Sequence, residues 1–234
     1  TYTINDNDKP NIDFNTTSSS ADESVSSADL TVDLSATFSQ NVTVDYVVTG
    51  TATGSGTDFT LTDGTLTIIA GQKTGTISII DIIDDILDEE NETVIVTLSN
   101  PNNAILGTDL VHTYTINDND DSPGVDFNIV SSESDEPSSS INITVDVSEV
   151  SGRQISVDYM VTGTANGSGI DHDLEDGTLT IEAGESNVIF TIPNIIDDDL
   201  AEDDETIIIT LSNPTNAILG DDNIHTHTIL ANDD

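Results

Sequence analysis

Asp63-Gly64-Thr65-Leu66-Thr67-Ile68 occurs a second time, letter for letter, at residues 176–181, an offset of 113 residues. Working outward, residues 44–46 recur at 157–159, residues 97–101 at 210–214 and residues 103–107 at 216–220, all at the same offset. Long gapless matches at one offset are the signature of a repeat architecture. The chain therefore contains two tandem copies of one module.

Within each copy, apolar and polar residues alternate with a period of two. Leu30, Val32 and Leu34 are separated by Thr31 and Asp33. Similar runs lie at 12–14, 42–48, 66–68, 77–79, 94–98 and 112–116. Turn residues such as Asp63-Gly64 and Asn100-Pro101 separate the runs. About seven short strands in roughly 110 residues are typical of an immunoglobulin-like sandwich, so we expect an all-β chain of two tandem seven-stranded sandwiches.

The same repeat predicts the domain boundaries. Residues 1–8 are identical to residues 113–120, which close the first copy. We therefore expect residues 1–8 to be the closing strand of a preceding repeat, followed by one domain at 9–120 and a second at 121–234. This interpretation makes the chain part of a longer array. In the alternative, residues 1–8 complete the sheet of a neighbouring molecule by strand addition.

The charge balance excludes several classes of partner. The chain has 45 Asp and Glu against 3 Lys and Arg, and a formal net charge of −42. Binding of nucleic acid or of an anionic membrane surface requires basic side chains, so neither is expected. No apolar run approaches the roughly 20 residues of a membrane span, and no signal peptide opens the sequence. Cysteine is absent, which excludes disulfides and thiolate metal sites.

An enzyme is not expected. His112, His225 and His227 lie on the predicted closing strands, where a packed or surface histidine is the favoured interpretation. His172 takes the position of Phe59 and is interpreted as a surface substitution, although it could perturb a metal site. Paired carboxylates can hydrolyse glycosides, but here they repeat in both copies without tryptophan, and aromatic residues make up only 4%. The same shortage argues against carbohydrate binding.

The carboxylates gather at predicted strand ends and loops. The densest runs are residues 84–92 and their counterpart 197–205, and a second acidic stretch follows the closing strand at 117–120. Two unit charges at 4 Å repel by about 4 kcal/mol at an effective dielectric constant near 20. Ca²⁺ offsets such repulsion because it accepts six to eight oxygen ligands in flexible geometry. The sequence therefore predicts Ca²⁺, and not Zn²⁺ or Mg²⁺, at one tip of each sandwich.

At these residues the sequence resembles the Calx-β domain, a family that includes regulatory domains of sodium–calcium exchangers and repeats of bacterial surface proteins. The resemblance rests on 50–59, 63–66, 83–92 and 98–101. It implies a seven-stranded sandwich with several Ca²⁺ ions per domain at the tip where the chain exits. The ligands implied in the first copy are Glu23, Asp58, Asp84, Asp85, Glu89, Glu92, Asp118 and Asp120. Those in the second copy are Glu136, Asp171, Asp197, Asp198, Asp199, Glu202, Glu205 and Asp233.

The two copies depart from this pattern in different ways. Ile86 stands where a third consecutive Asp would be, so the first copy is expected to hold fewer ions in its loop. In the second copy, Ala231 replaces Asp118, so its exit strand is expected to coordinate more weakly. Residues 5–10 are also similar to the Ca²⁺-binding linkers of cadherins, but the rest of the cadherin pattern is missing.

The expected function is that of a Ca²⁺-binding structural repeat. Only Asp121 and Ser122 separate Asp120 from Pro123, a linker too short for free tumbling of two domains. Ca²⁺ would then stiffen a stalk or fibre of a secreted or bacterial surface protein used in adhesion, with adjacent repeats, and other surface proteins or fibre subunits, as partners. The alternatives are a Ca²⁺-switched interaction or sensing module, and a filament subunit assembled by strand exchange through residues 1–8.

Overall fold

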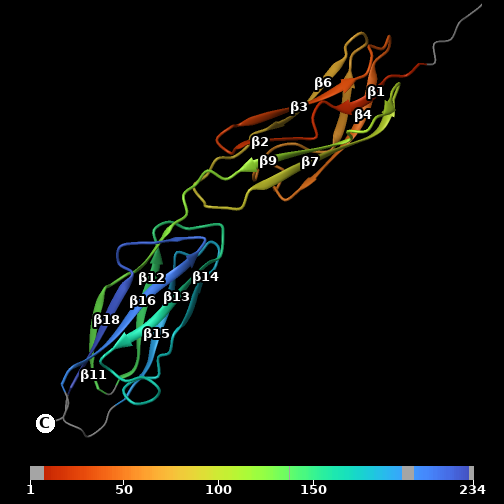
Figure 1. The fold of residues 1–234 in the computed structure, drawn as a ribbon. Helices are drawn as coiled ribbons and strands as arrows, with labels where there is room; N and C mark the ends of the chain where they lie inside the picture. Colours follow the sequence, from red (N-terminus) through yellow and green to blue (C-terminus); the bar gives the residue numbers. More distant parts are fainter. Residues whose placement is uncertain (1–7, 137, 197–202, 232–234) are drawn as a thin grey trace, which may run out of the picture. The chain divides into compact units, whose positions relative to one another are not determined.

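The computed structural model describes residues 8–136, 138–196 and 203–231. In these ranges the chain is built from β-strands and contains no helix, and it forms two compact units (Figure 1). Among the described residues, the first unit comprises 8–86 and 90–119, and the second comprises 87–89 and the residues from 120 onward. The predicted all-β chain of two sandwich-like halves is confirmed.

The first unit contains nine strands in two sheets. They are β1 (Asn11–Phe14), β2 (Ser18–Asp22), β3 (Ser27–Leu34), β4 (Val42–Gly50), β5 (Gly64–Ile68), β6 (Thr74–Ile80), β7 (Glu92–Asn102), β8 (Ile105–Leu106) and β9 (Val111–Asn117). One sheet has the order β6-β3-β1-β8 and the other has the order β2-β9-β7-β4-β5. Two pairs, β1 with β8 and β2 with β9, are parallel, and the other pairs are antiparallel.

The second unit repeats this arrangement strand for strand. Its strands are β10 (Gly124–Phe127), β11 (Ser131–Asp135), β12 (Ser138–Val147), β13 (Ile155–Gly163), β14 (Gly177–Ile181), β15 (Asn187–Ile195), β16 (Glu205–Thr215), β17 (Ile218–Leu219) and β18 (Ile224–Leu230). The sheet orders are β15-β12-β10-β17 and β11-β18-β16-β13-β14. The sequence repeat is thus a repeat of topology.

The period-two pattern places one apolar face of each strand in the core. Leu30, Val32 and Leu34 on β3 are at most 1% exposed, while Thr31 between them is exposed. Val94 and Val96 on β7 are completely buried in the same core. Such alternation is what a sheet with one solvated face requires.

The strands differ from the prediction in two places. Each unit has two short strands beyond the seven expected, β2 and β8 in the first unit and β11 and β17 in the second. The opening strand is in effect divided, because β1 belongs to the four-stranded sheet and β2 to the five-stranded sheet. Ser18-Ser19-Ser20 gives no apolar alternation, so the sequence pattern does not reveal β2. Residues 1–7 lie outside the described residues, and so does most of the predicted preceding strand.

Gly50 closes β4 in a conformation that only glycine adopts readily. Its φ is +138°, and a Cβ atom at this position would lie 2.0 Å from the carbonyl oxygen of Thr93. Gly163 has the same geometry in the second unit, with a φ of +133°. The close approach of these two segments leaves no room for a side chain and fixes where the following loop departs.

We predict that Ile79→Ala lowers the free energy of unfolding of the first unit by about 2–5 kcal/mol, because it leaves a cavity in the core. Ile79 is completely buried. The matched control is Ile80→Ala on the same strand, where the side chain is 44% exposed and the change should be within about 0.5 kcal/mol. Denaturant unfolding measures both variants. Equal losses in the two would contradict the assignment of the inward face.

Candidate metal centre

The parallel pairing of β2 with β9 determines where the acidic residues of the first repeat meet. In this pair Asp22 lies opposite Asn117, and the backbone amide of Glu23 donates to the carbonyl oxygen of Asn117 over 3.0 Å. Two parallel strands end at the same edge of a sheet. Glu23 and Asp118, the residues that follow these strands, are therefore brought side by side, although 95 residues separate them.

Glu23, Asp118 and Asp120 form a compact group of carboxylates. Each offers one oxygen, and these oxygens all lie within 4.8 Å of one another. Glu23 is buried, and the other two are half-buried. Within the described part of the chain, atom Oδ2 of Asp120 is buried and has no hydrogen-bond partner. A buried, unpaired carboxylate oxygen is costly unless a cation satisfies it, so this group has the composition and geometry of a cation site.

The long acidic loop between β6 and β7 reaches the same end of the unit. The side-chain amide of Asn119, between Asp118 and Asp120, donates to Asp84 over 3.4 Å. The backbone amide of Asp118 donates to the side-chain oxygen of Asn91 over 3.0 Å. The loop and the exit segment are therefore hydrogen-bonded at two points beside the carboxylate group. The predicted strand-connecting loop at residues 84–92 is a loop from residue 84 to residue 91, and Glu92 already belongs to β7.

The other predicted ligands of the first copy lie outside the three-residue group. Asp58 accepts from the amide of Thr53 over 2.5 Å and thereby closes its own loop, and its carbonyl accepts from Ile83, the residue before Asp84. Asp85 is exposed. Glu92 begins β7 opposite Ile116 of β9, and so it lies at the end of the sheet that carries Asp118.

The second copy shows the same backbone arrangement with fewer acidic side chains. On parallel strands β11 and β18, Asp135 lies opposite Leu230, so Glu136 emerges beside Ala231, which takes the place of Asp118. Asp171 caps its loop by accepting from Asn166, and Glu205 begins β16. The predicted ligands Asp197, Asp198, Asp199, Glu202 and Asp233 lie outside the described residues.

Asp88 has a role that the sequence pattern did not indicate. It is 4% exposed and belongs to the second compact unit, as Glu89 does. Its carboxylate lies 3.5 Å from the guanidinium of Arg153, the only arginine in the chain, and it accepts from the hydroxyl of Ser151 over 3.2 Å. Glu89, a predicted ligand, lies against Gly152 in the same unit. Asp88 is therefore a buried structural carboxylate whose counter-ion is the guanidinium of Arg153.

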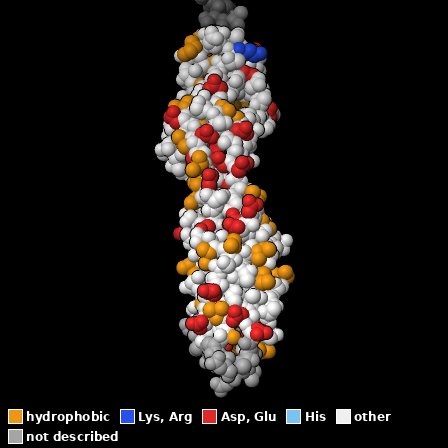
Figure 2. All heavy atoms as spheres, turned by 90° about the vertical axis from the view of Figure 1, so that its left-hand side faces the viewer, with side chains coloured by type: hydrophobic (Ala, Val, Ile, Leu, Met, Phe, Trp, Pro, Cys, Tyr) orange, Lys and Arg blue, Asp and Glu red, His pale blue; other side chains and the backbone are white. Residues whose placement is uncertain are grey.

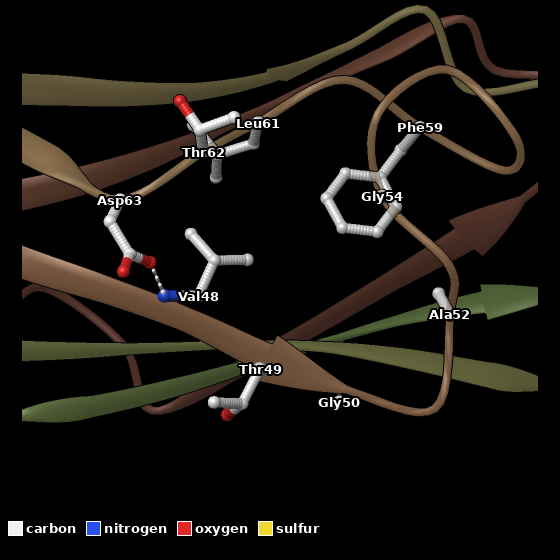
Figure 3. A pocket seen from close by; sticks show the side chains of 9 residues that line it. All are labelled: Val48, Thr49, Gly50, Ala52, Gly54, Phe59, Leu61, Thr62 and Asp63. Carbon is white, nitrogen blue, oxygen red and sulfur yellow. Dashed lines mark hydrogen bonds between the residues drawn. The ribbon is translucent and has the colours of Figure 1, made fainter.

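A separate pocket lies beside the loop that follows β4. It has a volume of about 410 Å³ and is lined by Val48, Phe59 and Asp63 among others. Figure 3 shows Asp63 hydrogen-bonded to the backbone amide of Val48, with the ring of Phe59 across the pocket. Because this pocket contains one carboxylate and mostly apolar or backbone walls, it lacks the features of a cation site.

The second unit has a similar pocket of about 320 Å³, where His172 replaces Phe59. His172 is 2% exposed, and its Nδ1 accepts from the backbone amide of Leu174 over 3.1 Å. The interpretation of His172 as a surface substitution is therefore wrong. The position is a core position in both copies, and the histidine is retained there because a local backbone amide satisfies its ring nitrogen.

Carboxylates are also spread over the rest of the molecular surface. On the face drawn in Figure 2 they occur throughout both units, whereas basic side chains form one small group. With a formal net charge of −42, the protein strongly repels itself at low ionic strength. This background makes a cluster of three carboxylates at close range unfavourable unless a cation is present.

Comparison with known proteins agrees with this geometry. The model of the Calx-beta domain matches the chain twice, at residues 5–120 and 118–234. The chain belongs to the Calx-beta family. The resemblance stated from the sequence is thus confirmed, and the tandem arrangement with it.

Several proteins are similar to this pair of Calx-beta domains. Adhesion G-protein coupled receptor V1 of Danio rerio is 31% identical over 180 residues, which is 74% of this chain but only 3% of the receptor. Among solved structures, CBD12 from CALX1.2 is 23% identical, with a TM-score of 0.44 and coverage of 91% of this chain and 83% of that one. The apo-form Calx CBD1 domain is 29% identical, with a TM-score of 0.44, and covers 48% of this chain and all of its own.

One further observation concerns membranes. In the parts of these Calx-beta domains that the structure describes, there is no helix with the length and apolar character needed to cross a bilayer.

We predict that Asp120→Asn stabilises the first Calx-beta domain in the presence of a chelator. Removing one of three charges within 4.8 Å relieves repulsion of about 1–3 kcal/mol per pair, depending on the local dielectric constant. The control is Asp121→Asn, an exposed neighbour whose replacement should change the free energy of unfolding by less than about 0.5 kcal/mol. Chemical denaturation in chelator measures both. A loss of stability in Asp120→Asn would show that the carboxylates are not in repulsive contact.

Proposed function

We propose that this chain is a Ca²⁺-binding structural segment of an extracellular surface protein, in which Ca²⁺ at the exit end of each repeat stiffens a longer array. The observation that carries the proposal is the group of Glu23, Asp118 and Asp120, with its buried carboxylate oxygen. The Calx-beta family membership and the likeness to an adhesion receptor of Danio rerio support a calcium-dependent module at a cell surface.

The donor set favours Ca²⁺ over other cations. The group contains three carboxylates. Asn119 lies between two of these residues in the sequence, and its side-chain amide donates to the carboxylate of Asp84. Ca²⁺ takes oxygen ligands of this kind in irregular geometry, whereas Mg²⁺ requires a near-ideal octahedron and retains its waters. Zn²⁺ prefers thiolate or imidazole, and no histidine or cysteine belongs to this group in the described residues.

Binding at this group would join three segments that are distant in sequence. Glu23 follows β2, Asp118 and Asp120 follow β9, and the acidic loop is hydrogen-bonded to the exit segment through Asn91 and Asp84. A cation held by all of them replaces mutual repulsion with shared attraction. Because the ion binds the folded state alone, its binding free energy adds to the stability of the fold.

The stiffening role follows from where the ligands stand in the sequence. Asp120 is the last ligand of the first repeat, and Pro123 is already buried at the start of the second. Ordering the exit segment therefore also orders the two-residue linker that leaves it. Neighbouring repeats of the same parent protein are the proposed partners, and the segment itself carries no catalytic function in this proposal.

We predict that Ca²⁺ raises the free energy of unfolding by about 2.7 kcal/mol per site when its free concentration is 100 times the Kd. For a domain of this size the melting temperature should rise on the order of 10 °C. Differential scanning calorimetry with chelator, Mg²⁺ or Ca²⁺ measures the shift. Asp120→Asn should lose much of it, and Asp121→Asn should keep it. Equal stabilisation by Mg²⁺ and Ca²⁺ would count against the proposal.

We predict that removal of Ca²⁺ increases the dimensions or the flexibility of the two-domain chain in solution. Small-angle X-ray scattering before and after chelation measures this change, because ordering of the linker narrows the distribution of interdomain distances. Unchanged scattering would contradict the stiffening role while leaving Ca²⁺ binding intact. A Kd near millimolar fits a spacer, whereas micromolar affinity with a large structural change would favour a Ca²⁺-switched interaction module.

A further inference from the structure

The second repeat contains a buried pair of histidines that the first repeat lacks. His225 and His227 face inward from β18, and both side chains are 0% exposed. The equivalent positions on β9 are His112 and Tyr114. The neighbouring strand changes in step, because Ser134 on β11 faces His227 whereas its equivalent on β2 is Ala21. At this place in the fold, Ser134 and His227 of the second repeat thus take the positions of Ala21 and Tyr114 in the first.

The histidines and two serines form one continuous chain of hydrogen bonds. His225 Nδ1 lies 2.7 Å from the carbonyl oxygen of Ile129, and Ser132 Oγ lies 2.8 Å from His225 Nε2 and 2.7 Å from His227 Nδ1. Ser134 Oγ lies 3.1 Å from His227 Nε2. These contacts tie β11 to β18 through side chains, in addition to their parallel backbone pairing.

The direction of every bond in this chain is set by its first member. A carbonyl oxygen only accepts, so Nδ1 of His225 carries the proton and its Nε2 must accept from the hydroxyl of Ser132. Ser132 then accepts from Nδ1–H of His227, which leaves Nε2 of His227 to accept from Ser134. This arrangement satisfies all four side chains when both rings are neutral. A second proton on either ring would have to bind an Nε2 atom that already accepts a hydrogen bond from a serine hydroxyl.

Among the described residues of β16, no carboxylate is paired with either histidine. On β16, the residues paired with His225 and His227 are Ile209 and Ile207, both completely buried. From the facing sheet, the ring of Phe127 lies 5.5 Å from that of His225. An imidazolium at this site would therefore be surrounded mainly by aliphatic and aromatic groups.

The charged residues of the adjoining strands lie to the side. Glu133 and Asp135 alternate with the two serines on β11 and are exposed, so they project to the opposite face. Glu205 shares the inward face of β16 but is paired with Ile229, which lies two residues beyond His227 on β18. The charged group that acts most directly on His227 is His225 itself, whose positive charge would oppose a second one.

We propose that the serine–histidine chain is an acid-sensitive latch, which holds β11 on β18 near neutral pH and releases it when the two histidines take up protons. The first repeat has one histidine and a tyrosine at these positions, so its β2 lacks the second imidazole ring and should be less sensitive to acid than β11. Because Glu136 directly follows β11, release would also displace a predicted ligand of the second repeat. This last consequence rests on the proposed Ca²⁺ function, whereas the latch does not.

The sign of the pH dependence follows from burial. Burial lowers the pKa of His225 below its usual value of 6.5, although the bond to Ile129 opposes this shift. Burial, followed by the charge of His225, lowers the pKa of His227. Once β11 is released the rings are exposed and bind protons near pH 6.5. The latch therefore contributes its full stability above about pH 6.5. This stability is lost as the pH falls through the lowered pKa values that the two histidines have in the folded state.

The test is native-state hydrogen exchange of the full chain, followed by mass spectrometry between pH 7.5 and 5.5, in chelator and again with saturating Ca²⁺. Peptides that cover β11 and β2 are compared within the same molecule after correction for intrinsic exchange rates. Because His112 and His225 occupy equivalent positions, the difference in exchange protection between β11 and β2 reports on His227. One extra proton bound in the open state raises the opening constant about tenfold per pH unit. We expect β11 to lose protection by that factor relative to β2 below pH 6.5.

The matched control is the double variant Ser134→Ala with His227→Tyr, which places the Ala21 and Tyr114 pair of the first repeat into the second. In this variant β11 and β2 should respond equally to acid. Equal responses in the wild-type chain would overturn the proposal. A second readout is the imidazole titration by NMR, where titration of His227 at or above pH 6.5 with β11 still protected would also overturn it. Failure of Ca²⁺ binding would change neither readout in chelator.

Discussion

Repulsion between carboxylates at the end of β9 is the constraint to which much of the first repeat responds. The parallel register of β2 with β9 delivers Glu23 to Asp118, and the antiparallel register of β7 with β9 delivers the acidic loop to the same edge. The register of β7 with β9 follows from the buried alternation of these two strands. Together with the parallel pairing of β2 with β9, it brings negative charge together at this edge. With three basic residues in the whole chain, few side chains are available to offset this charge.

One buried carboxylate, that of Asp88, has its negative charge offset by a basic side chain of the protein itself. Asp88 has the guanidinium of Arg153 at 3.5 Å and the hydroxyl of Ser151. Glu23, Asp118 and Asp120 instead place three carboxylates within 4.8 Å of one another. The only arginine of the chain lies at Asp88, and the proposed function assigns the neutralisation of the denser cluster to a metal ion. The two sites therefore represent two ways of placing carboxylates in a low-dielectric environment.

The sequence predicts the strands with apolar alternation well, because burial of one face is a local and periodic requirement. The all-β class follows from the same alternation, whereas the repeat follows from matches at one offset and the acidic loop from the clustering of carboxylates between strands. It does not reveal β2, since Ser18-Ser19-Ser20 has no apolar side chain and is held by pairing with β9 and by the bond from Ser19 to His112. His172 and Asp88 could not be placed either, because a buried polar residue is determined by partners distant in sequence. Among the predicted ligands, the structure gathers Glu23, Asp118 and Asp120, and the remaining assignments stay predictions.

The two repeats share a fold but have diverged in how they use polar residues. The first concentrates carboxylates at its exit, whereas the second has Ala231 in place of Asp118 and places histidines on the strand that leads to it. In physical terms, the first exit gathers carboxylates, which are ligands for a cation, and the second repeat contains two buried histidines, which are the basis of the proposed response to acid. The two repeats therefore differ in the polar side chains they carry without any change of topology.

The most direct measurement of the central claim is calorimetric titration of Ca²⁺ into the chelated chain, compared with the variant Glu23→Gln. Glu23 is the buried member of the carboxylate group, and the amide keeps its shape while removing its charge. We expect saturable binding by the wild-type chain and at least one fewer bound ion, or a Kd raised at least tenfold, in the variant. Identical titrations of the two proteins, or no saturable binding up to millimolar Ca²⁺, would contradict the account.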